Sequence, residues 1–314
     1  MSILKMRILF SMLIRYNKML SYLNSNLAKR NFMAAELSRH THSIEKGLTI
    51  NKPRLGFGHE KQKRMMELIL LLKDDCSEYH REVCIVALDA LHEYITYHQE
   101  KGYSDEMCEE IHEFLRVHKT ELEEKKGGII RIDKSDLMFD EEILEKFFRT
   151  RHSIRDFSDQ DVNDITLRKA LELAQQAPSA CNRQGVRVYV LDKEKSKKMA
   201  EKLRGVGGFA EKASRIVMIT GKVSSYRQEE MYQYIVSASI YAAYLSLTLH
   251  AYGLGSCVIQ RQVVWSREWD DLRNSFGIPE DEQQIVLLAV GNMKDSFFVP
   301  VSHRLHNNEM IRFL

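Results

Sequence analysis

Apolar residues recur at helical spacing through the first part of the chain. From Gln62 to Tyr97 they fall every three or four positions, which predicts one long helix. The stretch K-G-Y-S-D at 101–105 would end that helix, and Ser104 is a suitable N-cap for the next one. Because no strand pattern precedes about residue 135, we expect residues 1–135 to form a helical N-terminal extension.

The pattern changes after the charged run E-L-E-E-K-K-G-G at 121–128, where helices and strands begin to alternate. Helical spacing covers 140–149, 162–177 and 231–253, and β-branched runs predict strands at 186–191, 216–220, 256–259 and 285–291. The helix at 231–253 is apolar on nearly all sides, so we expect it to be buried in a core or a subunit interface. The sequence therefore predicts an α+β domain over residues 136–314.

Residues 1–30 form an apolar and basic stretch that contains no acidic residue. Lys5, Arg7, Arg15 and Lys18 interrupt it, so a transmembrane span is not predicted, and no A-x-A site follows that would indicate a signal peptide. On a helical wheel the cations gather opposite the apolar residues. This pattern predicts either peripheral contact with an anionic membrane surface or packing against the protein itself or a partner.

Composition narrows the class of protein. The chain has 314 residues, with 46 basic and 44 acidic side chains, and this balance argues against a nucleic-acid-binding protein. Its five cysteines include no C-x-x-C pair, which favours reduced thiols and a cytoplasmic location. His40, His42 and Glu45 resemble a ligand set but lack a fourth partner, so we predict no metal site.

The candidate chemistry begins with R-H-S-I-R-D-F at 151–157. If this segment is extended, Arg151, Ser153 and Arg155 lie on one side and His152 on the other. Two guanidinium groups and a hydroxyl on one side are suited to binding a phosphate. A solvated charged strand is the alternative that the segment alone leaves open.

Three further stretches supply donors, acceptors and turns: A-P-S-A-C-N-R-Q at 177–184, A-Y-G-L-G-S-C-V-I-Q at 251–260, and G-N-M-K-D followed by V-P-V-S-H-R at 299–304. Each alone reads as an ordinary polar turn or tail. Glycines in the second stretch allow backbone N–H groups to approach a ligand closely. Arg304 adds positive charge near the C-terminus.

Taken together and in this order, the four stretches resemble the nitroreductase family of FMN-dependent oxidoreductases. The resemblance covers about residues 140–314. It implies a nitroreductase-like fold with a mostly antiparallel central sheet flanked by helices. It also implies FMN as cofactor, NAD(P)H as co-substrate, and a homodimer with an FMN at each end of the subunit interface.

The resemblance assigns roles to particular residues of this chain. Those expected to bind FMN are Arg151, His152, Ser153, Arg155, Pro178, Ser179, Asn182, Ile259, Gln260, Arg261 and Arg304. Arg151, Ser153 and Arg155 would hold the phosphate, ribityl chain and pyrimidine edge, and Arg304 would add a further contact to the phosphate. The loop at 178–182 would reach the flavin from the other subunit, and the turn at 259–261 would face N5. No catalytic side chain is assigned, because flavin N5 would be the reactive centre.

The chain departs from the family's usual pattern at Gln184-Gly185-Val186, at Gln260-Arg261, and at Ser302, where a lysine is common. The first two departures leave the substrate open. Three functions therefore stand. The first is an NAD(P)H oxidoreductase that reduces a nitro, quinone or enone-like acceptor or a biosynthetic intermediate. The others are a flavin-dependent dehydrogenase or oxidase on a polysaccharide-pathway intermediate, and a non-catalytic, membrane-associated dimeric scaffold.

The stretch from Arg39 to His59 resembles the N-terminal extension of nitroreductase-like proteins associated with bacterial polysaccharide biosynthesis. We interpret it as a loop, and our hypothesis is that it folds over the flavin mouth as a lid or specificity element.

Overall fold

The computed structural model describes residues 3–24, 29–118, 125–203, 206, 208–259, 267–304 and 310–313. The helices are α1 (Ile3–Asn24), α2 (Lys29–Thr49), α3 (His59–Leu72), α4 (Glu78–Glu100), α5 (Glu106–His118), α6 (Glu141–Thr150), α7 (Asp164–Ala174), α8 (Lys193–Lys202), α9 (Gln233–Ala251) and α10 (Arg267–Ser275). The strands are β1 (Val186–Leu191), β2 (Arg215–Lys222), β3 (Leu254–Ile259) and β4 (Glu282–Asn292).

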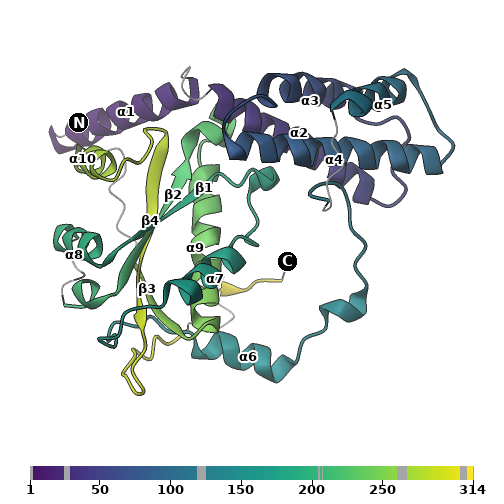
Figure 1. The fold of residues 1–314 in the computed structure, drawn as a ribbon. Coiled ribbons are helices and arrows are strands. Elements are labelled where there is room, and N and C mark those ends of the chain that lie inside the picture. Colours follow the sequence, from purple (N-terminus) through teal and green to yellow (C-terminus); the bar gives the residue numbers. More distant parts are fainter. Residues whose placement is uncertain are drawn as a thin grey trace.

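These strands form one antiparallel sheet in the order β1-β2-β4-β3 (Figure 1). Side chains of β2 alternate between two cores: Val217 and Ile219 face one, and Met218 faces the other. Helices α7 and α9 cover the first face, and α8 and α10 cover the second. The predicted α+β fold with a helix-flanked antiparallel sheet is confirmed.

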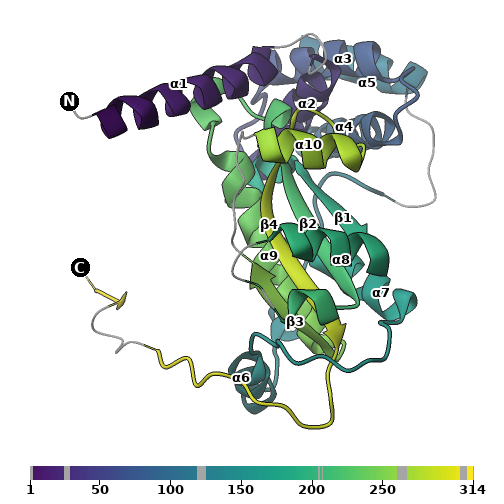
Figure 2. The same cartoon turned by 90° about the vertical axis from the view of Figure 1, so that its left-hand side faces the viewer.

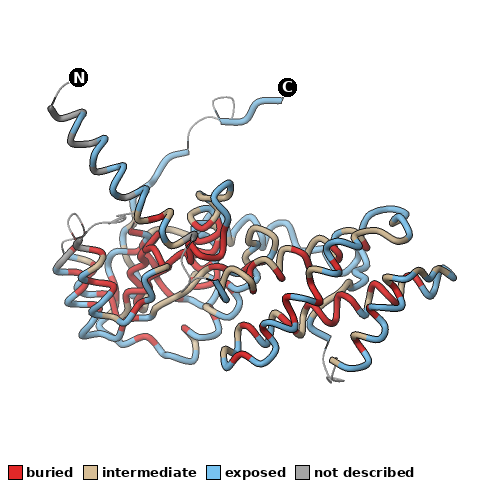
Figure 3. The backbone as a smooth tube through the Cα atoms, turned by 90° about the horizontal axis from the view of Figure 1, so that it is seen from above, coloured by how far each residue is buried: buried red, intermediate tan, exposed pale blue. Residues whose placement is uncertain are grey.

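The N-terminal helices form two groups. Helices α2 to α5 enclose a core of their own beside the sheet. Helix α1 instead packs on the sheet domain, because Met19 is buried in the core under α9 and Lys18 pairs with Asp270 of α10 at 2.5 Å. Leu9 and Phe10 of α1 and Phe298 and Val301 of the C-terminal tail are exposed, and both segments extend away from the body of the protein (Figure 3). The division at residue 135 stays a prediction.

Two local predictions about this region were wrong. The stretch from Gln62 to Tyr97 is two helices, α3 and α4, separated at residues 73–77, where an Asp75 oxygen accepts a hydrogen bond from the Ser77 amide at 2.9 Å. This turn competes with the helical backbone although apolar spacing continues through it. Before α5, Asp105 rather than Ser104 accepts from the Cys108 amide, at 2.8 Å.

Other boundaries follow the sequence closely. Strand β1 spans Val186–Leu191 as predicted, and the Asp140 side chain caps α6 by accepting from the Ile143 amide at 2.9 Å. Helix α9 ends at Ala251, and Gly253 adopts a left-handed φ of 71° that turns the chain into β3. Arg39 to Thr49 is not a loop, because it lies within α2.

Candidate functional site

The segment 151–157 runs extended beside β3. The amide of Ile154 donates to the carbonyl of Ser256 at 2.9 Å, and Phe157 bridges to Met293 next to β4. Ile154 and Phe157 are buried at 4% and 3% exposure, so they fix the segment to the sheet. Arg155 between them is exposed, and the three-residue spacing of Ile154 and Phe157 departs from strict period-2 alternation.

The arginines of this segment have unused hydrogen-bonding capacity. Arg151 and Arg155 form no ion pair among the described residues, and the guanidinium of Arg155 lies 5.9 Å from the ring centroid of Phe209. Burial raises the pKa of the Cys257 thiol, and Arg155, Ser153 and Arg151 partly offset that rise. These side chains therefore create a positive potential at the end of the segment, where an anion would be stabilised.

A histidine joins this segment to the C-terminal end of α9. His250 Nε2 lies 3.0 Å from the hydroxyl of Thr150, and its ring lies 5.3 Å from that of Phe147. Burial lowers the pKa of His250, and the nearby Arg151 and His152 lower it further. Because His250 is held neutral, it does not compete with the arginines for an anionic ligand.

The remaining predicted residues of this group fall in different places. Ile259 is buried at the end of β3, paired with Leu287 of β4. Gln260 and Arg261 lie outside the described residues. Arg304 is exposed on the C-terminal tail, which runs outward from the sheet domain past α6 (Figure 2), and it donates to the Ser302 carbonyl within that tail.

The loop 178–184 forms a second cluster of predicted residues. Cys181, Asn182 and Gln184 adopt left-handed φ angles of 52°, 49° and 50°, although none is glycine. Each such conformation costs about 1–3 kcal/mol, so the surrounding structure has to hold it. The hydroxyl of Ser179 helps, because it accepts from the Gln184 amide at 3.0 Å.

Sequence reasoning missed the residue that anchors this loop. Arg183 is 2% exposed, and its two terminal nitrogens donate to both oxygens of Glu230 at 2.8 and 2.7 Å. Its guanidinium also lies 5.2 Å from the ring centroid of Tyr226. Burial is the largest influence and alone would lower the pKa of Arg183, but the hydrogen bonds and the charge of Glu230, with smaller contributions from Cys181 and Tyr226, together raise it. In the sequence Arg183 looked like one more polar residue in a turn.

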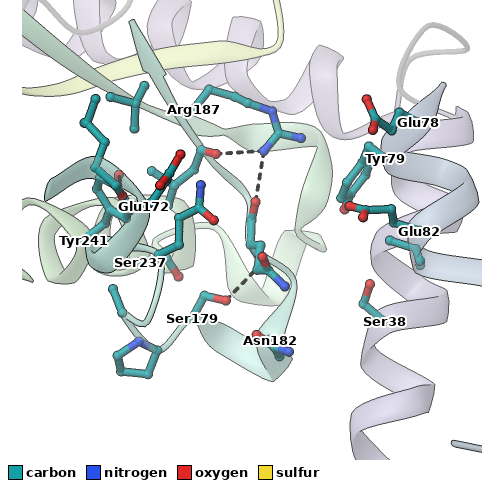
Figure 4. Close-up of a pocket in the computed structure, with 18 of the residues that line it drawn as sticks. Ser38, Glu78, Tyr79, Glu82, Glu172, Ser179, Asn182, Arg187, Ser237 and Tyr241 are labelled. Atoms are coloured by element: carbon teal, nitrogen blue, oxygen red, sulfur yellow. Dashed lines mark hydrogen bonds between the residues drawn. The ribbon is translucent and has the colours of Figure 1, made fainter. Parts of the chain in front are cut away.

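A cleft of about 1280 Å³ separates this loop from the N-terminal helices. Ser179, Asn182 and Arg187 line one wall, and Tyr79 and Glu82 of α4 line the other (Figure 4). The guanidinium of Arg187 bridges towards α4, 5.1 Å from the ring centroid of Tyr79. The loop is therefore exposed on one side and supported on the other.

The two clusters lie at opposite ends of α9. The loop meets this helix at Ser237, whose hydroxyl accepts from the Ala180 amide at 3.4 Å, and the arginine segment meets it at His250. These contacts are about 20 Å apart along the helix axis. A ligand shorter than this distance cannot contact both places within one subunit. We call residues 151–155 the cationic half-site and residues 178–184 the loop half-site.

Comparisons with known proteins match the part of the chain that holds both half-sites. The family model described as "Nitroreductase family" matches residues 148–233. A curated Archaeoglobus fulgidus protein, which carries the name NADH dehydrogenase/NAD(P)H nitroreductase, is 31% identical over 160 residues, covering 49% of this chain and 87% of the relative.

Two solved structures are also similar. An FMN-dependent nitroreductase from Clostridium difficile is 26% identical, with a TM-score of 0.46, covering 53% of this chain and 96% of that one. A Desulfovibrio desulfuricans protein described in complex with FMN is 20% identical, with a TM-score of 0.46, covering 54% and 94%.

Proposed function

Since this chain belongs to the nitroreductase family, we propose that it is an FMN-dependent oxidoreductase that uses NAD(P)H to reduce a small organic acceptor. The observation that carries the proposal is the cationic half-site. Two arginines that have no carboxylate partner among the described residues are held at the edge of the sheet by the buried Ile154 and Phe157. Such fixed and unpaired donors are the arrangement that a doubly ionised phosphate needs.

The donor set fits FMN. Arg151, Ser153 and Arg155 would bind the phosphate, which carries about −1.5 to −2 charges, and the adjoining polar chain. In the loop half-site Pro178 and Asn182 are exposed and Ser179 is half-buried, so all three are available to the ring system of a flavin in a second subunit. When bound, FMN supplies hydride chemistry between a nicotinamide and an acceptor. The protein's part is to bind, orient and exclude water.

The proposal includes a homodimer. Helix α9 and its N-cap residue Tyr232 present an apolar outer face, on which Tyr232, Val236 and Tyr244 are 65%, 46% and 38% exposed. If two copies of α9 pack antiparallel across a two-fold axis, the cationic half-site of one copy meets the loop half-site of the other, at both ends of the interface. Phe298 of the C-terminal tail is fully exposed and would also be covered by the second copy.

Helix α1 supports a further part of the proposal, which is peripheral contact with an anionic membrane at the inner face. Its outward side carries Leu9, Phe10 and Leu13 at 50%, 68% and 54% exposure, while Met19 and Lys18 tie its other end to the body. No acidic residue precedes Glu36. Apolar side chains flanked by cations are what an interfacial helix requires. The five free cysteines favour the cytoplasm.

Anaerobic mixing of the purified protein with NADH or NADPH tests the leading function. We expect a flavin absorbance band in the purified protein and its prompt bleaching by at least one nicotinamide. A flavin that stays oxidised would favour the dehydrogenase or oxidase alternative. Protein that is colourless and takes up no added FMN would contradict the proposal and leave the membrane-associated scaffold. Cosedimentation with anionic but not neutral vesicles tests α1 separately.

A further inference from the structure

The loop half-site is connected to the N-terminal helices through Arg183. The backbone carbonyl of Arg183 accepts a hydrogen bond from the hydroxyl of Tyr79 in α4 at 3.3 Å. Its side chain binds Glu230, which ends η6 (Gln228–Glu230) just before α9. One buried arginine therefore contacts three parts of the chain that are distant in sequence.

The network continues into α2. Glu230 also accepts from the backbone amide of Arg227 at 3.2 Å, and the Arg227 guanidinium donates to Glu36 of α2 at 3.0 Å. Glu36 accepts in turn from Arg64 of α3 at 3.1 Å. Burial alone would raise the pKa of Glu36, but Arg64 and the other nearby cations lower it. The carboxylate therefore stays ionised and keeps α2 bonded to the segment that holds Arg183.

These contacts hold the chain at the residue between two left-handed backbone conformations. Arg183 has an ordinary φ of −73°, but both of its neighbours, Asn182 and Gln184, are left-handed. Helix α2 also lies against η3 (Ala180–Asn182), the turn that contains them. A strained turn without glycine reverts to commoner conformations when its anchor is removed. The anchor here is shared between the sheet domain and the helical region.

We propose that Arg183 is a positioning residue that holds the loop half-site in its flavin-contacting shape, and that α2 and α4 are part of its support. The N-terminal helices are thus a component of the cofactor site of the nitroreductase domain. The inference rests on the proposed function in one respect only, the identity of the ligand. The effect of Arg183 on the shape of the loop does not depend on FMN. An experiment on the apo-protein can therefore test the positioning role separately from the proposed function.

The main experiment compares Arg183→Met with Arg273→Met in the full-length protein. Arg273 is a matched control, because it is 6% exposed and lies near Asp270 and Glu280. It belongs to α10, which packs on the opposite face of the sheet from the loop. Hydrogen exchange of the apo-protein reports on the peptide 178–185. We expect about tenfold faster exchange there in Arg183→Met and no change in Arg273→Met. Equal exchange in both variants would overturn the proposal, whether or not the protein binds FMN.

FMN titration gives the functional readout. The titrations are run at a temperature at which both variants are fully folded. We expect Arg183→Met to weaken FMN binding about tenfold and Arg273→Met to change it by no more than about twofold. Arg183→Lys, which keeps the charge but not the two-point bond, should fall between them, and it replaces Arg183→Met if that variant does not fold. If Arg183→Met loosens the loop but binds FMN normally, the loop does not contact flavin and the positioning role is refuted.

Tyr79→Phe tests the contribution of the N-terminal helices. It removes only the hydroxyl that reaches the Arg183 carbonyl. We expect faster exchange in peptide 178–185 and FMN binding weakened about two- to threefold, with Tyr97→Phe, whose hydroxyl bonds to Pro53, as the control. If peptide 178–185 exchanges at the same rate in both variants, only the sheet domain supports the loop. That result would refute the proposal that the N-terminal helices take part.

Discussion

The cationic half-site and the loop half-site use their arginines in opposite ways. Arg151 and Arg155 have no carboxylate partner among the described residues, whereas Arg183 is buried and bonded to both oxygens of Glu230. The backbone follows the same division, because 151–157 is an unstrained extended segment and 178–184 contains three left-handed residues. The first region keeps its charge for a ligand, and the second uses its charge to hold its own shape.

This difference has a physical reason. An exposed guanidinium exchanges water for phosphate at little cost, so binding energy is retained for the ligand. A buried guanidinium without its partner would lose several kcal/mol of solvation, so Arg183 remains bonded whether or not a ligand is present. Substitutions in the two regions should therefore have different effects. Those in the cationic half-site should weaken ligand binding without changing the structure, and those in the loop half-site should change the conformation of the loop.

The largest effect is expected from reversing the charge of the cationic half-site. Arg151→Glu with Arg155→Glu removes two charge-assisted contacts and adds repulsion towards the phosphate, so FMN binding should weaken about 100-fold or more. Thermal stability should hardly change, because neither arginine has an ion pair within the part of the chain that the structure describes. Riboflavin, which lacks the phosphate, is the matched ligand control. Equal losses for FMN and riboflavin would show that these arginines do not bind the phosphate.

The next prediction tests whether the half-sites belong to different subunits. Arg155→Glu disables one half-site and Asn182→Glu disables the other. Co-refolding the two variants in equal amounts makes half the dimers mixed, and each mixed dimer has one intact site, so about a quarter of the wild-type FMN sites should return. Each variant refolded alone is the control. No recovery would mean that both half-sites act within one subunit, against the separation along α9.

A pH effect on stability is expected from His40, which lies on the side of the loop half-site. His40 in α2 is 8% exposed, and Arg39 donates to its Nε2 at 3.0 Å. Burial, with Arg39, lowers the pKa of His40 from 6.5 to about 4. Between about pH 6.5 and 4, His40 is protonated in the unfolded chain but stays neutral in the folded protein. The free energy of unfolding therefore decreases as the pH falls through that range.

His40→Asn should flatten this decline in thermal melts at pH 7, 6, 5 and 4, whereas His112→Asn on the exposed face of α5 should leave it unchanged. If the melting temperatures of both variants and the wild type fall equally with pH, His40 is not held neutral in the folded protein.

The contrast between the half-sites also explains what the sequence could predict. Ile154 and Phe157 are the apolar residues of an otherwise polar segment and mark where it is anchored to the sheet. Strand β1 is marked by its β-branched content and α6 by the Asp140 cap. These signals are local. Arg183 gives no local signal, because its partner Glu230 lies 47 residues away and its left-handed neighbours are Asn and Gln rather than glycine. Tertiary contacts determine the conformation of that loop, and such contacts cannot be read from the residue pattern along the chain.

The smallest effect should come from the loop backbone. Gln184 is exposed and its φ is 50°, so Gln184→Gly relieves strain while adding freedom to the unfolded chain, and the two nearly cancel. Gln184→Val places a β-branched residue in the same conformation and should cost about 1–2 kcal/mol in urea unfolding. Arg155 has ordinary extended geometry, so Arg155→Val and Arg155→Gly should show the reverse order, with glycine the less stable. If valine is as stable as glycine at position 184, the loop is not held left-handed, and the distinction between the two half-sites is lost.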